Sequence, residues 1–145
     1  MTAVPSFIDT NVWLYRLFDH KKIDVAERDR KRNIAISITS DEGIIISTQV
    51  VNEVSANFLK KTAFNEEQIK AVIQSLYHRC TMVEFNLNIF ESASDIHSRY
   101  NFSFWDGLIV ACALPARASI LYSEDMQDGL IVAGQLEIVN PFKSR

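Results

Sequence analysis

With 145 residues, 48% of them hydrophobic and 23% charged, the chain has the length and composition of one globular domain. Its net charge of −3 lacks the basic excess with which most nucleic-acid-binding proteins neutralise phosphate, so a nucleic-acid ligand would need another source of positive charge. No apolar run approaches the ~20 residues of a membrane span, and the N-terminus shows no secretion signal. We therefore expect a single cytoplasmic domain over residues 1–145, with no insertion into a membrane.

The N-terminal part of the chain predicts one strand and two helices. Residues 4–9, VPSFID, form a short apolar run that indicates a buried strand. Apolar side chains recur at helical spacing in residues 11–18, where Trp13 is expected in the core. The charged stretch 19–39 predicts a second helix. Residues 20–32 within it carry six Lys or Arg against three acids, which fits either contacts to RNA phosphates or a solvated face with i,i+4 ion pairs.

The next part predicts a strand and two further helices. The β-branched run at 43–47 indicates a second buried strand. Residues 48–62 have helical spacing, and Ser47 or Thr48 can serve as the N-cap. Residues 65–80 form the clearest amphipathic helix, with two acids in its first turn. Its expected apolar face consists of Ile69, Val72, Ile73, Leu76 and Tyr77.

The C-terminal half predicts three strands and two helices in alternation. Strands are expected within 81–85, 119–123 and 136–142, and helices over 88–101 and 104–118. Strands without apolar–polar alternation, separated by helices, are typical of parallel sheets covered on both faces. We therefore predict an α/β fold, a three-layer α/β/α sandwich around a parallel sheet of about five strands.

Acidic residues follow the predicted strands at one edge of this sheet. Asp9 closes the first strand, Glu53 lies in the helix after the second, and Asp106 lies near the start of the 104–118 helix. Asp125 and Asp128 come after the 119–123 strand. Ligands of parallel sheets bind beyond the carboxyl ends of the strands, so these acids are expected to converge there.

Simpler explanations exist for each acid taken alone. Asp9 and Asp106 could be helix N-caps, Glu53 a solvated helix position, and Asp125 or Asp128 a turn residue. A cluster of carboxylates repels itself unless a cation is bound, which makes an accidental cluster less favourable than a functional one. Mg²⁺ and Mn²⁺ prefer carboxylate oxygens, and such ions assist hydrolysis of phosphodiesters. The pattern therefore favours a site for metal-assisted hydrolysis.

Four stretches, FIDTNVWLY, TQVVNEV, FWDGLIVACAL and LYSEDMQDG, resemble in order and spacing the four acidic motifs of PIN-domain ribonucleases. The resemblance extends from Ser6 to about Phe142 and is nearest to the VapC-like toxins of bacterial toxin–antitoxin pairs. It implies an endoribonuclease that uses Mg²⁺ or Mn²⁺ to cut an RNA substrate. It also implies a small cognate antitoxin as a protein partner, and a homodimer.

The resemblance assigns roles to individual residues. Asp9, Glu53 and Asp106 match the first three catalytic, metal-binding acids of the family. Asn11 matches the polar residue that supports the first acid, and Ser123 the hydroxyl position before the fourth motif. The fourth acid is Asp125 or Asp128. We favour Asp125, which is nearer the end of the strand, and expect a supporting role for Asp128.

One position departs from the family pattern. Gly107 stands where the family usually has Ala after the third acid, and it keeps that position small. The metal site is therefore not expected to change.

Two other functions compete with this interpretation. A phosphohydrolase of the haloacid-dehalogenase type also places an Asp after its first strand, but it needs D-x-D, and position 11 is Asn. A catalytically silent PIN module would only bind RNA or a protein partner, and it would be expected to lack one or more of the acids. Trp105 could stack on a base, although core packing is the simpler explanation for an aromatic residue in an apolar run.

Cysteine and histidine offer no alternative site. Cys80 and Cys112 lack C-x-x-C spacing and a nearby histidine pattern, so we expect buried free thiols and no zinc site. The three histidines are scattered, and none adjoins a candidate nucleophile.

Overall fold

Short strands alternate with pairs of helices along most of the chain. The computed structural model describes residues 4–61 and 64–144. Its elements, in chain order, are β1 (Ser6–Ile8), α1 (Thr10–Leu17), α2 (Val25–Thr39), β2 (Ile44–Ser47), α3 (Thr48–Leu59), α4 (Glu66–Arg79), β3 (Thr81–Val83), α5 (Leu87–Tyr100), α6 (Phe104–Ala113), β4 (Ile120–Tyr122), β5 (Ile131–Val132) and β6 (Leu136–Val139).

The sheet has the strand order β3-β2-β1-β4-β6-β5. All neighbouring strands are parallel except β5 and β6, which are antiparallel. The prediction of about five parallel strands is therefore right for β1, β2, β3, β4 and β6, but it missed β5. This strand is only two residues long and precedes two residues of positive φ, Ala133 and Gly134, so it has no periodicity to detect.

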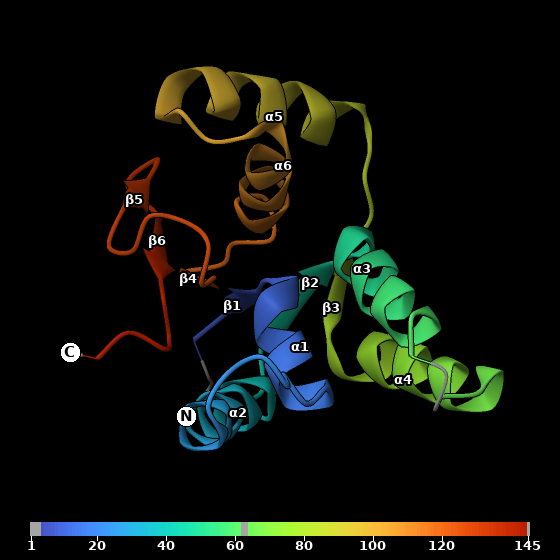
Figure 1. Cartoon of the computed structure of the whole chain (residues 1–145). Helices are drawn as coiled ribbons and strands as arrows, with labels where there is room; N and C mark the ends of the chain where they lie inside the picture. The colour runs from blue at the N-terminus through green and yellow to red at the C-terminus, as the bar shows by residue number, and fades with distance from the viewer. Residues whose placement is uncertain (1–3, 62–63, 145) are drawn as a thin grey trace.

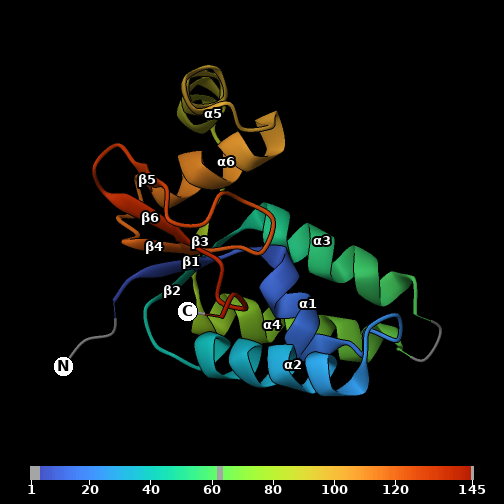
Figure 2. The same ribbon diagram turned by 60° about the vertical axis from the view of Figure 1, so that its left-hand side comes forward.

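Helices cover both faces of the sheet. Helices α5 and α6 lie on one side, and α1, α2 and α4 lie on the other (Figures 1 and 2). Phe7, Ile46, Leu121 and Ile138, from four neighbouring strands, are fully buried between these layers. The three-layer α/β/α architecture is therefore confirmed. None of the helices in the described ranges is long and apolar enough to cross a membrane.

Four of the six predicted helices agree with the structure to within three residues at each end. Helix α2, predicted from residue 19, begins only at Val25, after its N-cap Asp24, and α6, predicted to residue 118, already ends at Ala113, just before Pro115.

Helix α4 begins with a capping box in which Asn65 and Gln68 exchange side-chain and backbone hydrogen bonds. Its Tyr77 is 47% exposed, so the expectation that it belongs to the apolar face is wrong. Helix α3 follows Ser47 as N-cap and ends at Leu59; Thr62, the last residue of the predicted helix, lies outside the described residues.

The basic residues of α2 are largely paired. Arg30 forms an ion pair with Glu27 one turn away, at 2.7 Å. Two others reach different elements: Arg32 pairs with Asp19, and Lys31 pairs with Glu124. This helix is thus a solvated face with ion pairs that also fasten it to the rest of the molecule.

The two cysteines and Trp13 lie where the sequence suggests. Both cysteines are free; Cys112 is buried and Cys80 partly so, and burial raises their pKa values to about 12 and about 11. Their thiols therefore stay protonated near neutral pH. Trp13 is 2% exposed, and its indole N–H donates a hydrogen bond to the carbonyl of Ile8.

Gly107→Ala is expected to destabilise the protein. A Cβ at this position would lie 2.9 Å from the carbonyl oxygen of Ala93, so α5 and α6 would have to separate. Overpacking of this kind costs about 1–3 kcal/mol, against a gain of ~1 kcal/mol in helix propensity. We expect urea unfolding to show a net loss of about 1 kcal/mol. Unchanged stability would show that the two helices tolerate a wider spacing.

Candidate active site

The predicted acids meet in one pocket at the carboxyl end of the sheet. The pocket has a volume of about 250 Å³ and lies where β1 and β4 end and where α3 and α6 begin. Its acidic lining consists of Asp9, Glu53, Asp106 and Asp125. The remaining lining residues are Thr10, Asn11, Leu14, Trp105 and Ile109. The structure thus brings together one acid from each of the four motifs.

Asp9 is the most deeply placed of these acids. It is 7% exposed, and it accepts hydrogen bonds of 2.8 Å from the Thr10 N–H and from the Ser123 hydroxyl. Burial raises the pKa of Asp9 to about 6; the two hydrogen bonds oppose this rise, whereas the charges of Glu53 and Asp106 add to it. Asp9 is also the N-cap of α1, so the same side chain caps the helix and lines the pocket.

Asn11 connects the first and fourth motifs. Its side-chain amide group donates to Asp125 at 3.0 Å and to Asp9 at 3.3 Å. Its side-chain oxygen accepts the backbone N–H of Glu124 at 3.2 Å. One amide therefore holds the loop after β4 against the start of α1.

Ser123 is fully buried and faces Asp9. Its hydroxyl donates to Asp9 and accepts the backbone N–H of Asp125 at 3.3 Å. Because its proton is engaged by a carboxylate that holds other hydrogen bonds, the geometry suits orientation of Asp9 better than nucleophilic attack.

Asp106 and Glu53 approach from the two helices above the sheet edge. The N-cap of α6 is Ser103, whose hydroxyl accepts the backbone N–H of Asp106 at 3.1 Å, so the interpretation of Asp106 as an N-cap is wrong. Burial raises the pKa of Asp106, and the charge of Asp125 adds to the rise. Glu53 is half-buried in the second turn of α3, and its side chain lines the pocket.

Asp128 lies away from the carboxylates. Its side chain accepts the backbone N–H of Asn140 at 2.8 Å and lies 3.7 Å from the ammonium of Lys143. It does not line the pocket, whereas Asp125 does. Asp125 therefore shares the pocket with the other three acids, whereas Asp128 holds the C-terminal segment in place.

Sequence reasoning missed a cluster behind the loop that carries Asp125. Glu124 accepts hydrogen bonds from Tyr15 at 2.7 Å and from Lys31 at 2.6 Å. These contacts hold the loop against α1 and α2, and they pair the Glu124 carboxylate with the ammonium of Lys31. The partners are 109 and 93 residues apart in sequence, so only the acidic character of Glu124 itself could have drawn attention to it.

The chemistry of the pocket suits a divalent cation. Among the described residues, no Lys or Arg forms an ion pair with any of the four pocket carboxylates. No three His, Cys, Asp or Glu side chains in the described part of the chain are arranged to hold a metal ion as they stand. Mg²⁺ usually keeps several waters and binds through one or two carboxylates, so it does not require such a group. A buried, unneutralised acid such as Asp9 fits this mode of binding.

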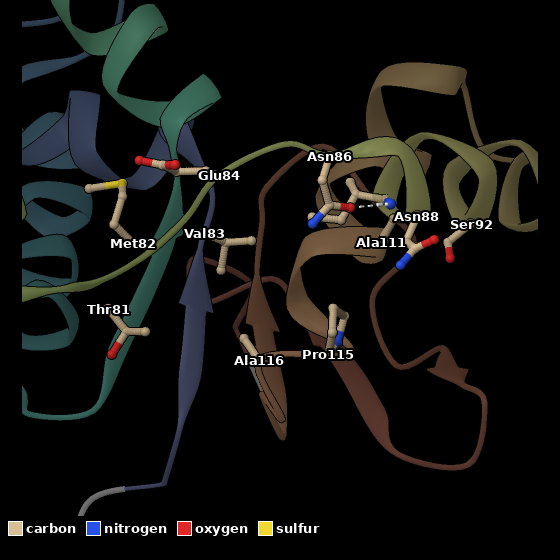
Figure 3. Close-up of a pocket in the computed structure, with 11 residues that line it drawn as sticks. Thr81, Met82, Val83, Glu84, Asn86, Asn88, Ser92, Ala111, Pro115 and Ala116 are labelled. Atoms are coloured by element: carbon tan, nitrogen blue, oxygen red, sulfur yellow. Dashed lines mark hydrogen bonds between the residues drawn. The ribbon is translucent and has the colours of Figure 1, made fainter.

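A larger pocket lies elsewhere, beside the sheet edge. It has a volume of about 540 Å³ and is lined by residues of β3, the start of α5 and the end of α6 (Figure 3). Glu84 is its single charged lining residue. The side chain of Asn86 already caps α5 by accepting the N–H of Ile89. Size alone therefore does not identify the site, and the smaller pocket has the reactive groups.

Solved structures of similar fold include several toxins. A toxin–antitoxin complex from Klebsiella pneumoniae matches with a TM-score of 0.65 and 19% identity over 94% of this chain and 97% of that chain. VapC20 of Mycobacterium tuberculosis, described as a sarcin-ricin loop cleaving toxin, matches with a TM-score of 0.60 and 15% identity over 80% and 86%. VapBC2 from Rickettsia felis, bound to promoter DNA, matches with a TM-score of 0.58 and 17% identity over 93% of this chain and 98% of that chain. Likeness at these identities establishes the shared fold.

The family is established by sequence. The PIN domain family matches residues 6–127, which include the first three acidic motifs and the fourth as far as Gln127, with Asp125. The chain therefore belongs to the PIN-domain family. A search of curated proteins finds no significant match.

Proposed function

We propose that this PIN domain is an endoribonuclease that depends on Mg²⁺ or Mn²⁺. The observation that carries the proposal is the pocket itself. It joins a buried Asp9 to Glu53, Asp106 and Asp125. Within the described residues, no cation of the chain pairs with them. A divalent cation would relieve this repulsion and supply the positive charge that a phosphodiester needs.

Each residue has a defined task in this proposal. Asp9 and Asp106 would hold the cation, and Glu53 and Asp125 would complete the acidic surroundings. A bound cation would activate water and stabilise charge on the phosphate. Ser123 donates to Asp9 and so favours its charged form, while Asn11 fixes the relative positions of Asp9 and Asp125.

The proposed biological role is that of the toxin in a toxin–antitoxin pair. The fold shared with the Klebsiella pneumoniae complex supports this role, and a small antitoxin is the expected partner. The description of VapC20 as a sarcin-ricin loop cleaving toxin supports RNA as the substrate. We further propose a homodimer and a cytoplasmic location. Induced expression should arrest growth, and coexpression of the antitoxin should restore it.

The test of the activity uses purified protein and total cellular RNA. Sequencing of the RNA ends should reveal discrete new cuts with Mg²⁺ or Mn²⁺ and none with a chelator. RNA binding without cuts in either metal would instead indicate a catalytically silent PIN module. Release of phosphate from small phosphoesters with intact RNA would indicate a phosphohydrolase.

A further inference from the structure

Trp105 is exposed at the rim of the carboxylate pocket. Its side chain is 65% exposed, which overturns the expectation of core packing. It lines the pocket and directly precedes Asp106 in the chain. Exposure of an indole forfeits the free energy of burial, about 1.5–3 kcal/mol for a large apolar side chain. A contact with a ligand at the pocket would recover it.

The pocket lining combines two kinds of side chain. Trp105, Leu14 and Ile109 are apolar, and four other lining residues are carboxylates. A nucleotide also has two such parts, a flat base and a charged phosphate. We propose that Trp105 is a stacking platform for an unpaired nucleobase next to the scissile phosphate. This inference rests on the proposed ribonuclease function.

The charge of the protein favours such a contact. Neutralisation of phosphate by Lys and Arg supplies most of the affinity of ordinary nucleic-acid binding. Here the net charge is −3, and no Lys or Arg of the described residues lines the pocket. Stacking on an aromatic ring does not depend on charge and tolerates any base. It is therefore a suitable second source of affinity beside the cation.

Stacking on Trp105 also selects the structure of the RNA. In a duplex each base is covered on both faces by its neighbours, whereas loops and single strands can present a free face to an aromatic side chain. A platform at the rim thus favours unpaired nucleotides. Phe104 offers a matched comparison, because it is 40% exposed beside Trp105 but does not line the pocket.

Tryptophan fluorescence reports directly on this contact. The chain has two tryptophans, and Trp13 is buried, so a change caused by RNA reports on Trp105. Mg²⁺ is present throughout, and oligomers with non-hydrolysable backbone linkages prevent cleavage during the titration. We expect quenching by a short single-stranded RNA and little quenching by a duplex or by an abasic oligomer with the same backbone. Equal quenching by the abasic oligomer, or none by the single strand, would overturn the proposal.

Cleavage kinetics in the presence of metal provide a second test, beside the fluorescence titration. Trp105→Ala should raise KM for single-stranded RNA by about 5- to 150-fold with little change in kcat, because stacking contributes to binding. Trp105→Phe should restore most of the affinity, and Phe104→Leu should behave as wild type. An unchanged KM in Trp105→Ala, or an equal loss in Phe104→Leu, would contradict the platform.

The two tests separate this inference from the proposed function. If the wild type cuts no RNA in either metal, the proposed function fails, whatever the fluorescence shows. If the wild type cuts RNA and Trp105→Ala cuts it equally well, only the platform fails. Trp105 fluorescence that changes with protein concentration in the absence of RNA would show that a second copy covers the indole, and it would also overturn the platform.

Discussion

Asp106→Asn is expected to abolish RNA cleavage while leaving the fold intact. The substitution keeps the shape of the side chain but removes its charge, so the proposed cation loses one of its two principal ligands. The hydrogen bond to Ser103 involves the backbone N–H of residue 106 and is retained. Loss of a direct ligand should lower the cleavage rate by more than about 100-fold, since even residues behind the ligands commonly contribute 10- to 100-fold. Cleavage rates and thermal melts of the two proteins provide the measurement.

Asp128→Asn is the matched control for this experiment. Asp128 lies outside the pocket, and an asparagine oxygen can still accept the N–H of Asn140. We expect this variant to cut RNA at nearly the wild-type rate. Full activity in a folded Asp106→Asn protein would remove the basis of the proposed function. Strong loss in Asp128→Asn would mean that the fourth acid has been misassigned.

Metal-free protein is expected to lose stability as the pH rises from about 4 to about 6. Burial raises the pKa of Asp9 from its ordinary value of 3.8 to about 6, so the folded state binds this proton more tightly than the unfolded state does. Stability from this source is therefore complete below pH 4 and lost above pH 6, by up to about 3 kcal/mol. The raised pKa of Asp106 acts in the same direction. Urea unfolding with a chelator across this pH range measures the effect.

Asp9→Asn and added metal separate Asp9 from other titrating groups. The stability of the variant should fall much less between pH 4 and pH 6. The difference between the two curves of stability against pH therefore reports on Asp9. Saturating Mg²⁺ should stabilise the wild type more at pH 7 than at pH 5, because it binds the charged carboxylate. Parallel curves for the chelated wild type and Asp9→Asn would show that burial of Asp9 carries no electrostatic penalty.

The convergence of the acids could be predicted because parallel strands end at a common edge. Asp9 follows β1 and Ser123 follows β4, and these strands are direct neighbours in the sheet. Any acid placed just beyond either strand therefore falls in the same region. Sequence could not decide between Asp125 and Asp128, because both lie in the same turn-forming stretch. The difference depends on Asn140, which holds Asp128 at the C-terminal segment.

The exposure of Trp105 and the contacts of Glu124 could not be predicted for different reasons. Trp105 lies in an apolar run whose later residues are buried, and the run does not show where the first turn of α6 leaves the core. Glu124 meets Tyr15 and Lys31 only because the tertiary fold brings three distant elements together. Both features depend on the relative placement of elements, which local periodicity does not encode.

Manganese bound in a crystal is the most direct test of the central claim that these carboxylates share a cation. An anomalous difference map from a crystal grown or soaked with Mn²⁺ should show a peak in the pocket, with carboxylate oxygens of Asp9 and Asp106 at about 2.1 Å. The peak should weaken or vanish in Asp106→Asn. A wild-type crystal with Mn²⁺ at full occupancy elsewhere and none in this pocket would contradict the account.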